Sequence, residues 1–169
     1  MTDDELERFC ADAYPKLVGA LTHHFGDRWL AEELTQEALV RACDHWTRVR
    51  TLSSPVGWAF HVGANLGRSR MRRRAAERRA RQRHGPDRTV HRDTDTADRL
   101  AVQDALTQLT PAQREAVVLR YFLELTAEET ADVTESSPGA VRGLTFRAMR
   151  VLRDQLDIQG DDKETADAS

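Results

Sequence analysis

The central part of this chain, residues 68–92, has almost nothing that a folded protein could bury. It holds eleven arginines against one glutamate and one aspartate, Glu77 and Asp87. The following segment, 84–98, shows no periodicity and contains Gly85 followed by Pro86. A domain needs its own apolar core, so this region divides the chain. We predict helical domains at 1–80 and 99–157, a flexible linker at 81–98, and a disordered acidic tail at 158–169.

The apolar residues of both predicted domains repeat with the period of an α-helix, and no stretch alternates as a strand does. Helix-start signals precede these patterns, with an N-cap side chain followed by proline or by a capping-box partner. We predict an all-α fold, with a kink or break at Pro15 and a loop at 47–54. The predicted N-caps are Thr2, Asp27, Ser54, Thr110, Thr126 and Ser137.

Residues 125–156 read as two helices joined by a tight turn. The second begins with Ser137 and Pro138, and its arginines occupy much of the side away from its apolar residues. A short helix, a three- or four-residue turn and a longer basic helix form the helix-turn-helix motif, whose second helix enters the DNA major groove. On these residues alone, an αα-hairpin with a solvated arginine face remains an alternative.

The formal net charge of −3 argues against a nucleic-acid binder, but the charge is unevenly distributed. Acidic ends flank the basic centre, which indicates a polyanion partner for the middle of the chain. Cys10 and Cys43 are predicted to be buried free thiols, with a disulfide or sensor pair as the alternative. The histidines have no metal or catalytic spacing, and there is no glycine-rich phosphate loop, so we predict no cofactor, no metal and no enzyme.

The start of the chain, MTDDELER, is acidic and unlike a signal peptide. No apolar run approaches the roughly 20 residues of a membrane helix. We therefore expect a cytoplasmic protein with no membrane insertion.

Three segments together resemble a known family. They are LAEELTQEALVRACDHW, SSPVGWAFHVGANLGRSRMRRR, and ALTQLTPAQREAVVLRYF followed by TAEETADVTESSPGAVRGLTFRAMRVLR. In this order the chain is similar to bacterial sigma factors of the extracytoplasmic-function group, which keep only sigma regions 2 and 4. The resemblance implies a promoter-specificity subunit that binds the β′ and β subunits of core RNA polymerase and promoter DNA. It also implies an inhibitory anti-sigma factor.

The resemblance assigns roles to individual positions. Taken alone, the polar side of the second helix reads as a solvated surface, but in the family it docks on the β′ coiled coil; its residues here are Glu33, Gln36, Glu37 and Arg41. Residues matching the −10 region, where a flipped base is captured and phosphates are bound, are Arg50, Trp58, Asn65, Arg68 and Arg72. Residues matching the −35 recognition helix are Ser137, Gly139, Ala140, Arg142, Gly143 and Arg147.

The chain also departs from the family pattern. Glutamates stand at positions 124 and 135, where the family often has glycine, and Thr134 stands in place of a leucine. Leu144 and Thr145 reverse the usual order of a polar residue and then leucine, which predicts a slightly rotated recognition helix. The loop TRVRTLSS lacks the common aromatic-glycine pattern, so the −10 sequence preference is open.

Two other functions fit the same residues. A stand-alone helix-turn-helix regulator would bind duplex DNA without polymerase, its first domain serving for dimerisation or ligand sensing. A helical protein-interaction module would leave the arginine-rich segment as a solvated surface, and its interactions would be insensitive to salt.

Overall fold

The computed structural model describes the backbone of residues 2–81 and 97–166, and the side chains of 3–81 and 97–157. The chain forms two compact units, Met1–Arg92 and Asp93–Ser169. Every regular element within the described residues is helical, which confirms the all-α prediction. Most of the predicted linker, 82–96, lies outside the described residues.

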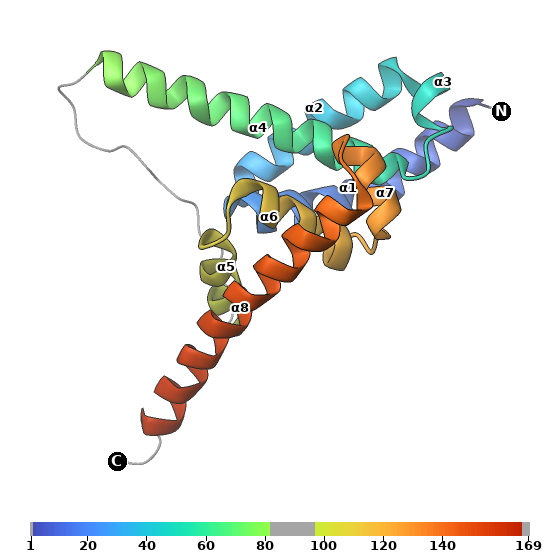
Figure 1. Cartoon of the computed structure of the whole chain (residues 1–169). Coiled ribbons are helices and arrows are strands. Elements are labelled where there is room, and N and C mark those ends of the chain that lie inside the picture. Colours follow the sequence, from blue (N-terminus) through green and yellow to red (C-terminus); the bar gives the residue numbers. More distant parts are fainter. Residues whose placement is uncertain (1, 82–96, 167–169) are drawn as a thin grey trace. The chain divides into compact units, whose positions relative to one another are not determined.

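Within the described part of unit 1, Met1–Arg92, the helices are α1 (Thr2–Phe25), α2 (Arg28–Asp44), α3 (Trp46–Val49) and α4 (Pro55–Ala80). The three long helices α1, α2 and α4 pack against one another, as Figure 1 shows. Their contact is apolar, because each helix has buried residues at helical spacing. The largest fully buried side chains in this unit include Leu17, Leu21, Leu34 and Phe60.

Two predicted N-caps begin helices in unit 1 as expected. Asp27 Oδ1 accepts from the Leu30 amide at 3.0 Å, and Ser54 Oγ accepts from the Gly57 amide at 3.1 Å. Each side chain satisfies an amide that has no partner inside its helix. The helices that carry the candidate residues of unit 1 therefore start where the sequence placed them.

Two local features of unit 1 differ from what the sequence suggested. α1 is not broken at Pro15, which lies inside a continuous helix. Pro15 is exposed, so water can satisfy the carbonyl that loses its hydrogen bond. The predicted loop 47–54 begins with helical turns, because α3 extends through Val49 and buries both Trp46 and Val49.

Unit 2, Asp93–Ser169, contains α5 (Ala97–Thr107), α6 (Pro111–Val117), the π-helical turn η1 (Val118–Phe122), α7 (Ala127–Thr134) and α8 (Pro138–Ala166). α5, α6 and α7 all pack against α8 (Figure 1). The predicted capping boxes are present at both Thr110 and Thr126. Ser137 Oγ likewise accepts from the Ala140 amide at 3.1 Å, at the start of α8.

The predicted boundaries of unit 2 need two corrections. Ala97 and Asp98, placed in the linker, belong to α5. The backbone of residues 158–166, which were expected to be part of a disordered tail, continues α8. Extending an existing helix adds one hydrogen bond per residue and needs no new nucleus, so a polar sequence can follow an established helix.

The π-helical turn η1 was not predicted. Its two aromatic residues, Tyr121 and Phe122, are 56% and 43% exposed. The chain then leaves the helix at Glu124, whose φ is 59°. The wider turn accommodates one extra residue, so the side chains after it fall on a different side from that expected of an α-helix. Leu125 is buried as predicted.

Arg114 is a structural arginine of unit 2. Its guanidinium donates to the carbonyls of Leu106, at 2.9 Å, and Leu109, at 3.0 Å, and so ties α6 to the end of α5. Burial lowers the pKa of Arg114. The Leu106 carbonyl lies in the last turn of α5, where carbonyls lack intrahelical donors, and the Leu109 carbonyl lies in the loop that follows.

None of the helices in the described part of the chain combines the length and apolar character that a membrane span requires.

Candidate functional site

The residues expected to dock on polymerase lie together on α2. Glu33, Gln36 and Arg41 are exposed and Glu37 is half-buried. Arg41 Nη2 donates to Glu37 Oε1 at 3.3 Å, one helical turn away. This surface offers apolar as well as charged groups. Trp29, one turn before Glu33, is 64% exposed, and Val40, next to Arg41, is 59% exposed.

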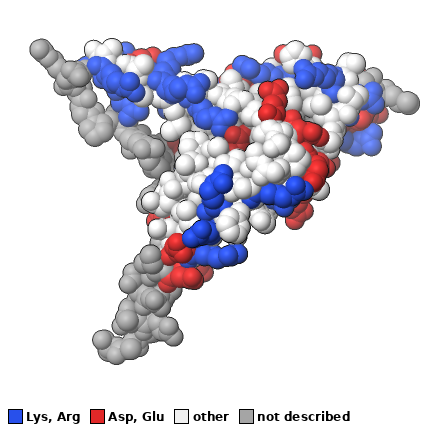
Figure 2. Space-filling view, in the orientation of Figure 1, with Lys and Arg blue, Asp and Glu red and all other residues white. Residues whose placement is uncertain are grey.

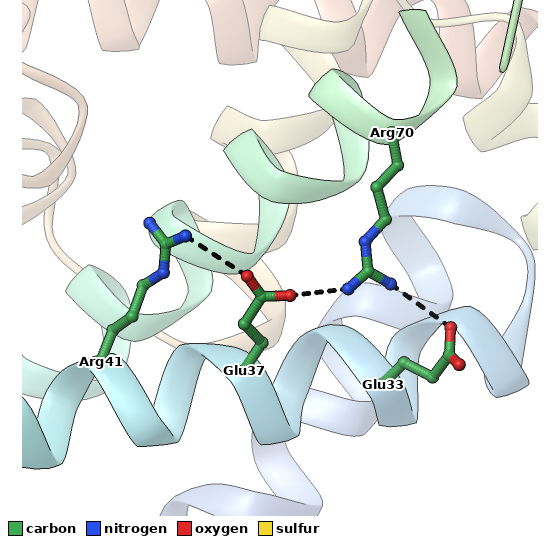
Figure 3. Close-up of polar contacts among 4 residues, drawn as sticks. All are labelled: Glu33, Glu37, Arg41 and Arg70. Atoms are coloured by element: carbon green, nitrogen blue, oxygen red, sulfur yellow. Dashed lines mark hydrogen bonds and ion pairs between the residues drawn. The ribbon is translucent and has the colours of Figure 1, made fainter. Parts of the chain in front are cut away.

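Arg70 of α4 joins this surface, although the sequence did not point to it. Its guanidinium bridges two α2 carboxylates, with Nη2 at 2.6 Å from Glu37 Oε2 and Nη1 at 3.3 Å from Glu33 Oε2 (Figure 3). The partners are more than 30 residues apart in the chain, so no local pattern pairs them. All three side chains are partly exposed, and such pairs contribute little to stability. Their main effect is to fix the position of both carboxylates.

The start of α4 holds the candidate −10 residues. Trp58, which was expected on the surface of its helix, is half-buried. It packs on the cluster of Ala42, Trp46 and Val49, so part of its side chain belongs to the core. Asn65 is exposed and lies two turns further along the same helix. Trp58 and Asn65 therefore differ in how much surface they offer to a ligand.

The amide of Asn65 is held by its own helix. Its Nδ2 is 3.1 Å from His61 Nε2, and its Oδ1 accepts from Arg68. A carboxamide has two N–H donors and two oxygen lone pairs. One donor and one lone pair of Asn65 therefore stay available to a polar ligand.

A shallow cavity of about 350 Å³ lies beside Asn65. It is lined by Arg41, Val62, Asn65, Leu66 and Ser69. The structure thus brings together two groups that the sequence kept apart, because Arg41 was assigned to the polymerase and Asn65 to DNA. Its wall combines one cation, one amide, one hydroxyl and two aliphatic side chains.

Beyond this cavity α4 is strongly basic. Arg72 is exposed and donates to Ser69 Oγ at 3.1 Å, and most of the neighbouring arginines are also exposed. Figure 2 shows Lys and Arg side chains gathered along this part of α4. Arg50 lies elsewhere, at the end of α3, where its Nη2 is 2.8 Å from Glu5 Oε2 of α1. Of the predicted phosphate-binding arginines, Arg50 is therefore separated from the set on α4.

The helix-turn-helix of unit 2 is formed by α7 and α8. Gly139, Ala140, Arg142 and Arg147 are exposed, and Gly143 is half-buried. A Cβ added to Gly139 would meet no atom within 4 Å, whereas one added to Gly143 would lie 3.3 Å from Arg147 Nη1. The Arg147 guanidinium therefore lies over the backbone of Gly143, on the outer side of α8.

Two features of α8 were not predicted as site features. Phe146 is 65% exposed between Arg142 and Arg150, each one turn away. Thr145 is buried and its hydroxyl donates to the Val141 carbonyl at 3.0 Å, so it takes a core-facing position. The sequence did contain a signal for Phe146. It is an apolar residue that lies outside the buried stripe of its helix, and an exposed apolar side chain in such a position often contacts a ligand or partner.

Arg142 also forms an ion pair with Glu128 of α7. The pKa of Glu128 is lowered, first by a hydrogen bond from the Glu128 backbone and then by the charge of Arg142. Both side chains are about 60% exposed, so this is a surface pair that a stronger acceptor can displace. Among the residues described, no group of three or more His, Cys, Asp or Glu side chains could hold a metal ion.

Two family models match the two units. Residues 11–77 match sigma-70 region 2 and residues 99–152 match sigma-70 region 4. The two matches lie within the predicted domains 1–80 and 99–157, in the expected order.

Named relatives point the same way. The RNA polymerase sigma-E factor of Streptomyces avermitilis is 33% identical over 128 residues, covering 75% of this chain and 71% of the relative. The sigma factor CarQ of Myxococcus xanthus is 29% identical, over 90% of both chains. The extracytoplasmic-function sigma factor SigD of Mycobacterium tuberculosis is 41% identical over 38% of this chain and 31% of the relative.

The fold is also known from a solved structure. The sigma factor RpoE of Bartonella quintana, in a co-crystal with the anti-sigma factor NepR, matches 91% of this chain and 98% of its own with a TM-score of 0.77 at 22% identity. Family models, relatives and fold agree, and the chain belongs to the sigma-70 family of RNA polymerase sigma factors, in the extracytoplasmic-function group.

Proposed function

We propose that this chain recruits core RNA polymerase to a set of promoters by dividing the work between three surfaces. The α2 surface of Glu33, Gln36, Glu37 and Arg41 binds the β′ coiled coil. The first half of α4 acts at the −10 element and the first turns of α8 act at the −35 element. The single observation that supports this most is that one chain carries both an exposed, capped, basic recognition helix and a pre-ordered acidic surface on a separate unit.

At the −35 element, α8 supplies two kinds of contact. Arg142 and Arg147 are exposed donors suited to guanine edges or phosphates, and Phe146 suits the methyl group of thymine. The small residues Gly139 and Ala140 allow the start of the helix to approach the bases closely. Arg142 exchanges its Glu128 partner for DNA, because one bidentate contact, with two hydrogen bonds to a base edge, outweighs a single exposed ion pair.

At the −10 element, the cavity beside Asn65 receives an unpaired base. Flipping a base costs a few kcal/mol, and the contacts of the extruded base offset this cost. Asn65 reads the edge of the base with its remaining donor and lone pair, Arg41 adds a charge-assisted hydrogen bond, and Arg68 and Arg72 bind the phosphates. No covalent bond is made or broken in this role, so the chain supplies binding energy and the polymerase catalyses the reaction.

An anti-sigma factor is the expected inhibitor. The relative from Bartonella quintana is bound by one in its crystal structure. The exposed apolar residues Trp29 and Val40 border the α2 surface and suit a protein partner, whether polymerase or inhibitor. A protein that covers α2 would exclude the polymerase by direct competition.

The decisive experiment is run-off transcription in vitro with purified core RNA polymerase on fragments of the source genome. Initiation at discrete start sites that depends on this chain is the expected result. Gel filtration with core enzyme is the companion measurement, since a stand-alone regulator would bind duplex DNA by itself and would not co-elute. A stable DNA-binding dimer that ignores core enzyme would contradict the proposal.

A further inference from the structure

Cys10 and Cys43 meet in space although 33 residues separate them in the chain. Cys10 lies on α1 and Cys43 in the last turn of α2, and their Sγ atoms are 4.0 Å apart. Both are free thiols. The prediction that both are buried was wrong for Cys43, which is exposed, while Cys10 is half-buried.

The two thiols differ in their access to a reagent. Cys43 faces solvent at the end of its helix, so a small oxidant reaches it without any opening of the fold. Burial, followed by the neighbouring Cys43, raises the pKa of the Cys10 thiol to about 11. Cys10 therefore stays protonated at neutral pH and reacts as the second, resolving partner.

The remaining gap is small. A disulfide bond is about 2.05 Å long, so the sulfurs must approach each other by about 2 Å. Rotation about the χ1 angles of the half-buried Cys10 and the exposed Cys43 covers such a distance more readily than backbone movement does. Both cysteines lie in well-formed helices, so the backbone that brings them together does not have to be created on oxidation.

We propose that Cys10 and Cys43 are a redox modification site that closes to an intramolecular disulfide with oxidants of the peroxide class. The Cys43 thiolate attacks one peroxide oxygen, the O–O bond breaks, and Cys43 becomes a sulfenic acid. The departing hydroxide takes up the proton that Cys43 lost on ionisation and leaves as water. Cys10 sulfur then attacks Cys43 sulfur. The S–O bond breaks, and the hydroxyl leaves with the Cys10 proton as a second water. Two thiols are oxidised by two electrons and one peroxide is reduced to two waters.

The disulfide would cross-link α1 to the end of α2 beside an aromatic contact. Phe9, next to Cys10, has its ring centroid 5.0 Å from that of Trp46. Trp46 belongs to the cluster of Ala42 and Val49 on which Trp58 also packs. Closing the bond therefore stiffens the part of unit 1 that supports the start of α4.

The test uses the full chain, reduced and then treated with a slight excess of hydrogen peroxide. After alkylation with iodoacetamide, intact mass should show a loss of about 2 Da with no alkylated cysteine, reversed by dithiothreitol. Peptide mapping should find the Cys10 peptide joined to the Cys43 peptide. The melting temperature of the oxidised chain should rise by roughly several degrees over that of the reduced chain, because the cross-link restricts the unfolded state.

Cys10→Ser and Cys43→Ser are the matched controls. Each keeps one thiol and should show neither the loss of mass nor the rise in melting temperature, while circular dichroism verifies that both are folded. Two outcomes would overturn the proposal. One is a wild-type chain whose two cysteines remain separately alkylated after peroxide; the other is disulfide found only between different molecules. Neither readout involves polymerase or DNA, so the result is independent of the proposed promoter role.

Discussion

Glu124 and Glu135 have backbone conformations that side chains other than glycine rarely adopt. Their φ angles are 59° and 53°, in the left-handed region. For an L-residue this region costs roughly 1–2 kcal/mol, because Cβ approaches the following carbonyl oxygen. The family often has glycine at both positions, so the structure gives a physical reason for that preference. The strain at these two residues is local and can be removed by substitution.

Glu135→Gly is expected to stabilise unit 2 by about 0.5–1 kcal/mol, the relief of left-handed strain less the added freedom of the unfolded chain. Urea denaturation followed by circular dichroism measures the change. Asp132→Gly is the matched control, because Asp132 is exposed but lies inside α7. It should destabilise by a few tenths of a kcal/mol, because glycine ranks just below aspartate as a helix former. Equal destabilisation by both would show that the left-handed backbone carries no strain.

Arg142→Ala is expected to weaken binding to duplex DNA that carries the upstream element by about 1–3 kcal/mol, as for an arginine that reads a base. Fluorescence anisotropy with matched and scrambled duplexes measures the difference. Arg153→Ala, an exposed arginine four turns into α8, is the control and should affect both duplexes equally. If Arg142→Ala also affects both duplexes equally, Arg142 binds phosphate and does not specify sequence.

At the scale of the elements, the close approach of α4 to α1 and α2 depends on a glycine. A Cβ at Gly67 would lie 2.3 Å from Phe25 Cζ and 2.9 Å from Leu34 Cδ1. Both contacts are far shorter than carbon atoms tolerate, so the helices or the side chains must move. Since α2 carries the acidic surface and α4 carries Arg70 and Asn65, helix spacing controls the candidate site.

Gly67→Ala is therefore expected to destabilise unit 1 by about 1–3 kcal/mol through overpacking. Thermal unfolding measures this, and weaker polymerase binding should accompany it. Gly139→Ala is the contrasting variant. It meets no atom within 4 Å and should stabilise α8 by up to about 1 kcal/mol, yet weaken DNA binding if the backbone there approaches the bases. A stable, fully active Gly67→Ala protein would show that the packing adjusts without cost.

The acidic surface of α2 gives a second prediction at this scale. Glu37→Ala should reduce binding of the chain to core polymerase. It should leave the binding of unit 2 to DNA without polymerase unchanged. Arg70→Ala should also reduce polymerase binding, because Glu33 and Glu37 lose their common partner. Its effect on unfolding should stay within about 1 kcal/mol, as for partly exposed ion pairs.

Arg28→Ala is the matched control for Arg70→Ala. It removes an exposed ion pair with Glu32, 3.2 Å long, on the same helix. Surface binding measurements with immobilised core enzyme should show a smaller loss than for Arg70→Ala. Equal losses for Arg28→Ala and Arg70→Ala would mean that charge alone, and not the bridge to α4, matters.

At the scale of the whole molecule, the two units act through one chain. Each has its own core, with Ala42, Trp46 and Val49 in one cluster of unit 1, and Leu106, Leu109, Val117 and Ala148 in one cluster of unit 2. Joining two binding units makes the second contact intramolecular, and its strength then depends on the connecting segment.

Residues 1–92 and 93–169, produced as separate polypeptides, are expected to bind a two-element promoter complex with roughly 10²–10⁴-fold lower affinity than the intact chain. Circular dichroism first shows that each polypeptide is folded, and promoter occupancy with core polymerase is then titrated. If the mixture occupies the promoter as well as the intact chain does, polymerase alone brings the two units together.

Local features were predictable from local sequence. The caps at Asp27, Ser54, Thr110 and Thr126 were all found as expected, because an N-cap contacts amides only two or three residues away. The buried stripe that includes Val141 and Ala148 followed from helical spacing for the same reason. Pro15 does not break α1, and the backbone at 158–166 continues α8, because a helix already begun continues through residues that would not start one.

Sequence alone thus determined that the chain is all-α, where most helices begin, and which residues resemble a sigma factor's contacts. The tertiary structure decided which of those residues meet: Arg70 with Glu33 and Glu37, Arg41 with Asn65 around one cavity, and Cys10 with Cys43. These contacts join residues 24 to 37 positions apart on different helices. Helix packing fixes such distances, and packing depends on every side chain in the core at once.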